Sequence, residues 1–551
     1  MMQKWIKSGQ PWIWLSASTV SISLILVFGL ILLIASRGMT HFWPKELLEF
    51  HYTERDGQAS VLVGEFHELE SVAAERLSDA GFELTDNQAF YDRMLLKTGN
   101  RDVGGQDFRW IVSKRILQQS RPDSLVAIER REWGNFYGYL QSIKEKGQVV
   151  VEGEAVALEL STRLRRALAI YEQIREVEKD EIGTINYGME RLRLKQRRLE
   201  LDGEATAANV QVIELEREQY QLDYNKLQAK LVALYEDINR DSLTAMVASG
   251  QVVEISLAKM VRVYYPNAMS LPAKIGFYLS KLWEFVSDDP REANTEGGVF
   301  PAIFGTVMMV LIMSIMVTPF GVVAAVYLRE YATQGVLTRI IRIAVNNLAG
   351  VPSIVYGVFG LGFFVYFLGG NIDALFYPEA APAPTFGTPG ILWSSLTLAI
   401  LTVPVVIVAT EEGLSRIPKS IREGSLALGA TKAETLWRTV LPMASPAIMT
   451  GLILAIARAA GEVAPLMLVG VVKLAPSLPL DTNMPFLHLD RKFMHLGFHI
   501  YDVGFQSPNV EAARPLVYAT ALLLVAVIVI LNLSAIAIRN HLREKYRSLE
   551  Q

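Results

Sequence analysis

The 551-residue chain contains no cysteine. Disulfide bonds, thiolate nucleophiles, Cys-ligated zinc and iron–sulfur clusters are therefore excluded, and any domain outside the cytoplasm must be stable without cross-links. The chain also lacks a G-x-x-x-x-G-K-[ST] phosphate loop, so it has no nucleotide cradle of the usual kind. If ATP hydrolysis drives this protein, a separate subunit must bind the nucleotide.

Motifs of known catalytic chemistry are missing as well. The seven histidines are scattered, and only His495 and His499 share a helical spacing, without the H-E-x-x-H pattern of a zinc site. No G-x-S-x-G motif accompanies the serines. A net charge of -4 gives no basis for nucleic-acid binding. We therefore predict a non-catalytic protein without metal, cofactor or nucleic-acid partner.

Charge is absent from five long stretches, and this absence indicates a membrane protein. A helix needs about 20 mainly apolar residues to cross the ~30 Å hydrocarbon layer. The stretches without Asp, Glu, Lys or Arg are 11–36, 297–328, 343–372, 380–410 and 515–538. A sixth, 443–472, is apolar except for Arg458 and Glu462. We predict six transmembrane helices, the first a retained anchor because it is too long for a signal-peptide core.

The distribution of Lys and Arg indicates the orientation, since short positively charged connections stay in the cytoplasm. With the N-terminus inside, the cytoplasmic segments carry fourteen Lys and Arg residues. The short outer connection 373–379 carries none, and 473–514 carries four. We expect both termini to be cytoplasmic and residues 41–290 to lie on the opposite side.

Residues 41–290 are long enough to form a folded domain between the first two spans. Short alternating segments broken by Gly, Pro, Asp and Asn predict strands over 45–153. Over 155–240, two segments with apolar residues three and four apart predict an antiparallel helical hairpin. A strand return follows at 243–265. The hairpin is either a spacer or a docking surface for a partner.

The segment "IREGSLALGATKAETLWRTVLP" (421–442) separates two apolar runs. Pro418 suits the start of a helix, and Gly429 can end it in a left-handed turn. Thr431 and Glu434 form a T-x-x-E capping box for a second helix, which we expect Pro442 to halt. Such a specified structure is either a hairpin that merely joins two spans or a rigid lever that transmits a push from a partner.

Arg458 and Glu462 lie four residues apart within an apolar run, so ~40° apart around a helix. Each charge at that depth costs roughly 2.5 kcal/mol or more, and such residues normally face a bundle interior or an aqueous cavity. The pair is either a structural ion pair or a site in a substrate pathway. We expect a transport pathway that contains both residues.

The segment 421–442 resembles the E-A-A-x3-G-x9-I-x-L-P pattern of the inner-membrane permease subunits of ABC importers. Glu423, Gly429 and Pro442 fall at the family spacing, whereas Ser425 replaces an alanine and Thr439 replaces the isoleucine. The resemblance implies a type I ABC importer permease fold, all-α in the membrane, with a periplasmic α+β insertion. It also implies an ATPase-coupling loop within 411–442, formed by Glu423, Gly424, Ser425, Gly429, Leu441 and Pro442.

More narrowly, four segments resemble the phosphate-specific permeases of the PstA family: 347–364, 411–442, 451–468 and 498–509. The resemblance covers 297–540 and implies phosphate import across the bacterial inner membrane. Arg458 would then contact phosphate, and Glu462 would hold the Arg458 side chain in place when the pathway is empty. The implied partners, besides membrane lipid, are a PstC permease in a heterodimer, a dimer of the PstB ATPase and the periplasmic phosphate-binding protein PstS.

The predicted organisation has four parts, which are a tail and first helix (1–40), a periplasmic domain (41–290), a permease domain (291–540) and a cytoplasmic tail (541–551). A permease for another oxyanion is an alternative. An ion-coupled secondary transporter is another, although it would need no ATPase lever. A membrane sensor with a periplasmic coiled-coil domain would leave five further spans unexplained. Copurification of an ATPase would favour the ABC permease.

Overall fold

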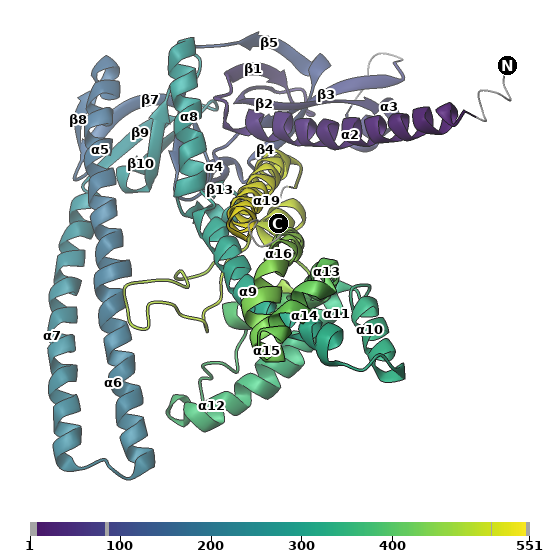
Figure 1. Cartoon of the computed structure of the whole chain (residues 1–551). Helices are drawn as coiled ribbons and strands as arrows, with labels where there is room; N and C mark the ends of the chain where they lie inside the picture. The colour runs from purple at the N-terminus through teal and green to yellow at the C-terminus, as the bar shows by residue number, and fades with distance from the viewer. Residues whose placement is uncertain (1–7, 83–87, 508–509, 547–551) are drawn as a thin grey trace. The chain divides into compact units, whose positions relative to one another are not determined.

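The computed structural model describes residues 8–82, 88–507 and 510–546. The chain divides into two compact units, unit 1 (Met1–His41 and Val299–Gln551) and unit 2 (Phe42–Gly298) (Figure 1). Six helices among the described residues are long and apolar enough to cross a membrane, which confirms the predicted number. These candidate spans are Gln10–Phe42, Phe300–Tyr331, Ser353–Phe376, Ile391–Arg416, Lys432–Gly461 and Ala513–Glu544.

Unit 2 contains two antiparallel sheets. The five-stranded sheet has the order β4-β3-β2-β1-β5, and the six-stranded sheet has the order β10-β9-β7-β6-β11, with β8 paired to β7. The first sheet comprises β1 (Leu47–Thr53), β2 (Ala59–Ala73), β3 (Phe90–Lys97), β4 (Phe108–Val112) and β5 (Ile116–Ser120). The second comprises β6 (Val126–Arg130), β7 (Phe136–Glu145), β8 (Gln148–Glu152), β9 (Asp241–Met246), β10 (Val252–Ser256) and β11 (Met260–Tyr264). A small hairpin, β12 (Pro290–Arg291) with β13 (Glu296–Gly297), ends the unit.

The helices of unit 2 are α3 (Ala74–Asp79), α4 (Arg101–Gly104), α5 (Val156–Arg175), α6 (Ile182–Asp202), α7 (Ala207–Ile238) and α8 (Leu271–Ser287). Buried side chains of α5 share a core with the six-stranded sheet, because its apolar residues recur every three or four positions. A π-helical turn joins α5 to α6, and α6 packs against α7 (Figure 1). Helix α8 lies in a segment for which the sequence predicted no element.

Unit 1 contains α2 (Gln10–Met39) and the permease helices. These are α9 (Phe300–Val326), α10 (Val336–Leu348), α11 (Ser353–Phe359), α12 (Gly370–Phe376), α13 (Ile391–Arg416), α14 (Lys419–Ala427), α15 (Lys432–Thr435), α16 (Leu441–Gly461), α17 (Leu466–Val469), α18 (Leu496–Tyr501) and α19 (Val510–Tyr546). Four π-helical segments extend them, namely Tyr327–Tyr331, Gly360–Gly369, Leu436–Val440 and Asp502–Gln506.

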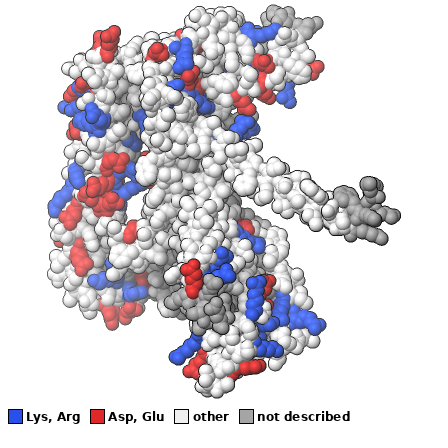
Figure 2. All heavy atoms as spheres, turned by 45° about the horizontal axis from the view of Figure 1, so that its top comes forward, with Lys and Arg blue, Asp and Glu red and all other residues white. Residues whose placement is uncertain are grey.

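Small residues allow the helices of unit 1 to pack closely. Helix α13 packs against both α9 and α16, and a Cβ at Gly451 of α16 would lie 2.6 Å from the Cβ of Ala409. In α2, a Cβ at Gly38 would lie 2.7 Å from the backbone nitrogen of Ala519 in α19. The rest of α2 is largely exposed, and its projecting length is white in Figure 2 because its described residues carry only one charge, on Arg37.

Two of the charge-free stretches begin before the membrane helices that they predict. Within 343–372 the chain is broken, because α10 ends at Leu348 and the candidate span begins only at Ser353. Pro352 lacks an N–H group and disfavours a helical conformation in the residue before it. Within 380–410 the helix begins only at Ile391, after a segment that contains three prolines.

Candidate functional site

The predicted turn and cap between α14 and α15 are confirmed. Gly429 follows α14 with φ +90°, a left-handed conformation that glycine adopts without a steric penalty. Thr431 Oγ1 accepts a hydrogen bond from the Glu434 backbone N–H at 3.2 Å. In return, Glu434 Oε2 accepts one from the Thr431 backbone N–H at 2.9 Å. The two helices are therefore joined by a defined turn.

The prediction that Pro442 halts the second helix is wrong. Helix α15, the π-helical turn Leu436–Val440 and α16 follow one another directly and form one candidate span, Lys432–Gly461. Pro442 occupies the first turn of α16, and the wider π-helical turn directly before it takes up the interruption of the hydrogen-bond ladder. The segment that carries the cap is therefore continuous with a membrane helix.

Apolar packing fixes this region to the rest of unit 1. A buried cluster joins the end of α13 to the π-helical turn and α16, and it consists of Leu414, Ile417, Leu436, Val440 and Ala444. Ile421 of α14 packs against it. The hydroxyls of Ser425 and Thr435 are 2.9 Å apart and connect α14 to α15. The two short helices are thus held to each other and to the membrane helices.

Charged contacts tie the same region to the end of α9. Arg422 donates to Glu330 Oε1 at 3.0 Å, and also to the carbonyl oxygens of Leu414 and Ile417. Lys432 donates to the Glu330 carbonyl oxygen, and its ammonium lies 4.5 Å from the centre of the Tyr331 ring. Displacement of α14 therefore acts directly on the Tyr327–Tyr331 segment.

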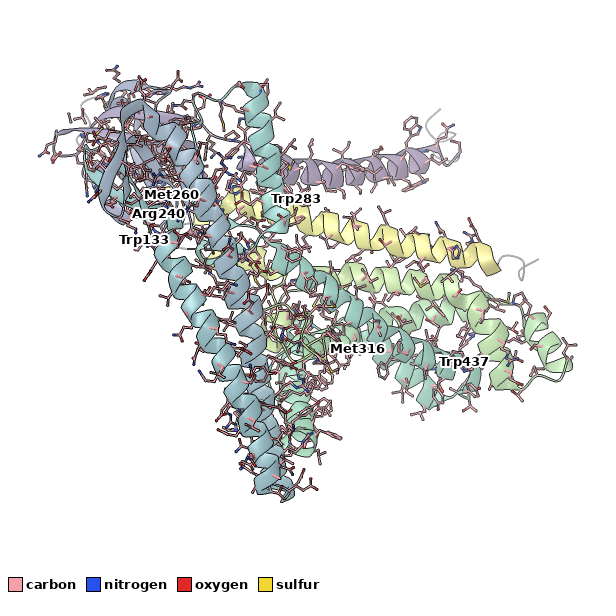
Figure 3. The ribbon with its side chains drawn as sticks, turned by 90° about the vertical axis from the view of Figure 1, so that its left-hand side faces the viewer. Trp133, Arg240, Met260, Trp283, Met316 and Trp437 are labelled. Carbon is pink, nitrogen blue, oxygen red and sulfur yellow. The ribbon has the colours of Figure 1, made fainter. Side chains whose placement is uncertain are left out.

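The predicted coupling residues divide into two groups. Glu423, Gly424 and Gly429 are exposed, and no atom would lie within 4 Å of a Cβ added at either glycine. The exposed surface around them includes Leu428, which is 92% exposed, and Trp437 (Figure 3). The partly buried residues face inward and are Ser425, Leu441 and Pro442. We call the exposed group, with Leu428 and Trp437, the loop surface.

Arg458 and Glu462 form an ion pair, but not within a continuous helix. Helix α16 ends at Gly461, and Glu462 is extended, with φ -79° and ψ 135°, so the predicted run 443–472 is broken near its middle. Arg458 Nε lies 3.7 Å from Glu462 Oε1, beyond hydrogen-bond length. Both side chains are partly exposed. The pair is therefore loose and accessible at a helix end.

The break after Arg458 lies near the break before α11. A Cβ at Gly357 of α11 would lie 2.6 Å from the Cα of Pro465, which follows Glu462. The hydroxyl of Tyr356 donates to the carbonyl oxygen of Leu348, the last residue of α10, at 2.5 Å. The charge of Arg458 also acts electrostatically on Tyr356. The start of α11 thus packs on the chain that follows Glu462.

His495 is a buried residue beside this arrangement, at the start of α18. Its Nδ1 accepts the Gly497 backbone N–H at 3.1 Å, and Gly497 lies against Val463. Burial lowers the pKa of His495 to about 4, so the ring is neutral at pH 7. His499 instead contacts the Thr520 hydroxyl at 3.3 Å. Among the described residues, no group of three His, Asp or Glu side chains could hold a metal ion.

The sequence did not predict that Tyr356 and the two helix breaks belong to the site around Arg458 and Glu462. Tyr356 lies within a charge-free run, where an aromatic side chain carries no signal of its own. Pro352 and Pro465 were visible signals of the breaks. Several prolines of unit 1, such as Pro319 and Pro404, nevertheless lie inside helices. Proline alone therefore does not locate a break in a membrane helix.

Comparison with known proteins identifies the family. The model of the "Binding-protein-dependent transport system inner membrane component" family matches residues 317–548. The phosphate transport system permease protein PstA 1 of Mycobacterium tuberculosis is 36% identical over 247 residues, which cover 44% of this chain and 71% of that protein. The chain belongs to this family of transport permeases. The predicted resemblance to the PstA permeases is confirmed.

A second relative and a solved structure match a similar share of the chain. The phosphate transport system permease protein PstC of Xylella fastidiosa is 31% identical over 246 residues, 43% of this chain and 73% of that protein. The match with a solved structure of the inward-facing MetNI methionine ABC transporter covers 50% of this chain and 99% of the chain in that structure. Its sequence identity is 17% and its TM-score is 0.34. As a family member with six candidate spans, the chain is a multi-pass, non-catalytic permease subunit of an ABC importer.

Proposed function

We propose that this permease moves inorganic phosphate across the bacterial inner membrane, within a type I ABC importer. The observation that carries the proposal is the Arg458–Glu462 pair between two interrupted helices, in a chain 36% identical to a phosphate permease over the matched part. Discontinuous membrane helices that meet near charged side chains are typical of substrate sites in transporters.

Arg458 has the chemistry that phosphate requires. A guanidinium stays charged and presents several donors in a planar fork that fits phosphate oxygens. At 3.7 Å, Glu462 neutralises it without occupying its donors in a short hydrogen bond. Glu462 can also accept a hydrogen bond from a protonated phosphate oxygen, which fully ionised sulfate cannot donate. Competition between carboxylate and substrate keeps binding weak enough for release.

The loop surface is the proposed docking site of the ATPase. Its exposed apolar side chains, Leu428 and Trp437, suit insertion into a groove on a partner. A push on α14 passes to α9 through the Arg422–Glu330 pair. A push on α15 passes along the continuous helix to Arg458, about 25 Å from Leu441 at ~1.5 Å per residue. The same helix thus connects the ATPase docking site to the proposed substrate contact.

The remaining partners follow from the same proposal. The chain pairs with a PstC-type permease above two PstB-type ATPases, and a PstS-type protein delivers phosphate from the periplasm. Both termini are cytoplasmic, and unit 2 is periplasmic. Unit 2 is not the primary phosphate site, because its acidic side chains are interleaved with basic ones and paired with them.

Reconstitution tests the proposed function. Proteoliposomes with the two permeases, the ATPase and the binding protein should take up phosphate only when ATP reaches the ATPase. An excess of sulfate should not compete. Uptake by this chain alone, driven by an ion gradient, would identify a secondary transporter instead. Uptake of another oxyanion in preference to phosphate would leave the ABC mechanism but refute the substrate.

Tags test the proposed topology separately. In sealed inner-membrane vesicles whose periplasmic face is outward, tags near residues 150 and 380 should be accessible from outside. A tag near residue 420 should not be accessible. A tag near 150 that is reached only from the cytoplasmic side would invert the orientation.

A further inference from the structure

Helix α8 of unit 2 carries an exposed apolar stripe. Leu271, Ile275, Leu279 and Trp283 recur every four residues and therefore lie on one face of the helix. Leu279 is 59% exposed and Trp283 is 71% exposed (Figure 3 labels Trp283). Lys, Arg, Asp and Glu are absent from this face. An uncharged stripe along most of a 17-residue helix is typical of an interaction site.

The opposite face of α8 fixes the direction of the stripe. Phe285 is buried, and the buried Glu284 accepts hydrogen bonds from Lys281, Arg262 and Arg291. Lys281 also donates to Glu129 of β6 at 2.6 Å. Because these ionic contacts hold α8 against the sheet, the helix cannot rotate to bury Leu279 or Trp283. The stripe is a permanent feature of unit 2.

Aromatic contacts connect α8 to the end of the first candidate span. Phe42 is the last residue of the span Gln10–Phe42, and its ring centre lies 5.1 Å from that of Phe285 and 6.5 Å from that of Tyr278. The ring centre of Trp43 lies 5.9 Å from that of Tyr278. Phe42 follows the charge-free stretch 11–36 by six residues, roughly 9 Å of helix, and the headgroup layer on one side of the bilayer is roughly 5–8 Å thick, so Phe42 lies near its outer edge.

We propose that α8 is an interfacial helix whose stripe lies in the outer leaflet of the phospholipid bilayer. The position of Phe42 places α8 at the height of the headgroups, and Trp43, Tyr278 and Trp283 are the residue types that favour this layer. A helix with one apolar and one polar face buries its apolar face at the boundary of headgroups and acyl chains.

This inference uses the six-span topology of the proposed function but neither its substrate nor its ATPase. A protein partner for the stripe is less favoured, because the helix that carries it packs on Phe42, the last residue of a candidate membrane span. The lipid requirement is for an apolar layer, so it does not depend on a particular headgroup.

Single cysteines test the proposal, since the chain contains none of its own. Leu279→Cys and, as a matched control, Leu158→Cys on α5, which is 78% exposed, are labelled with an environment-sensitive fluorophore. The full chain is studied in phospholipid nanodiscs. The probe at 279 should show blue-shifted emission, quenching by spin-labelled lipids and protection from aqueous iodide. The probe at 158 should show the reverse.

Two outcomes overturn the proposal. If iodide quenches the probe at 279 and spin-labelled lipids do not, the stripe faces water. If neither quencher reaches it, protein covers the stripe instead of lipid. Ile275→Cys repeats the measurement one turn away in case the label at 279 disturbs the helix. An impermeant thiol reagent applied to Leu158→Cys in sealed vesicles reports the side of the membrane on which unit 2 lies. A wrong topology can therefore be distinguished from a wrong position of the stripe.

Discussion

Charged side chains are arranged differently in the two units. In unit 2 they form networks, in which Asp241 accepts from Arg163, Arg166 and Arg240, each at 2.8–3.0 Å. In the permease helices, the partly buried pairs Arg342–Glu411, Arg422–Glu330 and Arg458–Glu462 share no residue with one another, and Arg458–Glu462 lies at a helix end.

This difference indicates that charged pairs contribute mainly to stability in unit 2 and mainly to function in unit 1. A network in water is redundant, and the loss of one member leaves the others in place. A charge within a membrane domain has a high cost and few neighbours to replace it. We therefore expect substitutions within the partly buried pairs of unit 1 to change transport, and substitutions within the buried networks of unit 2 to change local stability.

The largest expected effect is that of Arg458→Gln. It removes the proposed phosphate ligand and should abolish phosphate uptake in proteoliposomes while the complex still assembles. The matched control is Arg416→Gln, whose exposed ion pair with Glu412 spans 3.9 Å and should contribute little. Glu462→Gln should impair uptake or weaken discrimination against sulfate.

Two results would remove support from the pathway interpretation of Arg458. One is normal uptake by Arg458→Gln. The other is failure of the complex to assemble, which would make the structural ion pair the better interpretation. Gel filtration of the detergent-solubilised complex distinguishes these cases from a true transport defect.

The next largest effect is expected for Gly429→Val, which opposes the left-handed turn at φ +90°. A β-branched residue there costs about 1–3 kcal/mol and should disturb the angle between α14 and α15. Uptake and its coupling to ATP hydrolysis should fall, with the membrane helices folded. Gly57→Val is the control, since Gly57 has φ +84° and equally open surroundings, but lies in unit 2. Equal effects of both variants would contradict a specific role for the turn.

A smaller effect on transport, but a clear one on stability, is expected for Arg130→Met in unit 2. Arg130 is buried, forms two hydrogen bonds with Asp102 and donates to the carbonyl oxygens of Trp133 and Gly134. Arg130 is buried but Asp102 is 26% exposed, so the cost should be smaller than the about 3–5 kcal/mol of a fully buried pair. Hydrogen exchange of the full chain should show faster opening around β6.

Arg193→Met is the matched control for Arg130→Met. Arg193 pairs only with Glu190 on the exposed surface of α6, so hydrogen exchange should hardly change. An equally small effect of Arg130→Met would show that burial of the pair adds nothing.

The smallest effect concerns the pH dependence of the Asp241 network. Burial favours the neutral acid, but the hydrogen bonds and charges of Arg240 and Arg163 outweigh it and lower the pKa of Asp241 below its ordinary value of 3.8. The stabilisation is therefore present above pH 3.8 and is lost as the pH falls below it. Hydrogen exchange of β9 should stay constant from pH 7 to pH 4, after correction for the intrinsic rate. In Arg240→Met the pKa of Asp241 should lie closer to its ordinary value, so that less stability is lost below pH 4 than in the unsubstituted chain.

Local signals made part of this structure predictable. Six apolar runs, the turn at Gly429 and the Thr431 cap depend on neighbouring residues only, and all three predictions are confirmed. The continuity of the helix through Pro442 was not predicted, because it depends on a π-helical turn that no sequence signal marked. The presence of the Arg458–Glu462 pair was predictable, but not the helix end that separates the two residues.

Long-range contacts account for the rest. The sequence shows which residues are apolar, but not that Pro465 packs on Gly357 or that Tyr356 joins the site. Helix α8 was missed although its sequence carries a helical period, with Lys281 and Glu284 on one face and Leu279 and Trp283 on the other. The roles of Glu423, Gly424, Ser425, Leu441 and Pro442 in coupling stay predictions until an ATPase is bound.

The close approach of Gly38 to Ala519 has a consequence for the order of assembly. Helix α2 is synthesised before unit 2, whereas Ala519 lies in the last candidate span. At ~5–20 residues per second, the ribosome needs roughly half a minute to a minute and a half to reach it. During that time α2 stands in lipid without this partner while unit 2 folds. Docking of α2 onto α19 is therefore a late event in biogenesis, and it joins the two ends of the permease unit only after the intervening chain has been made.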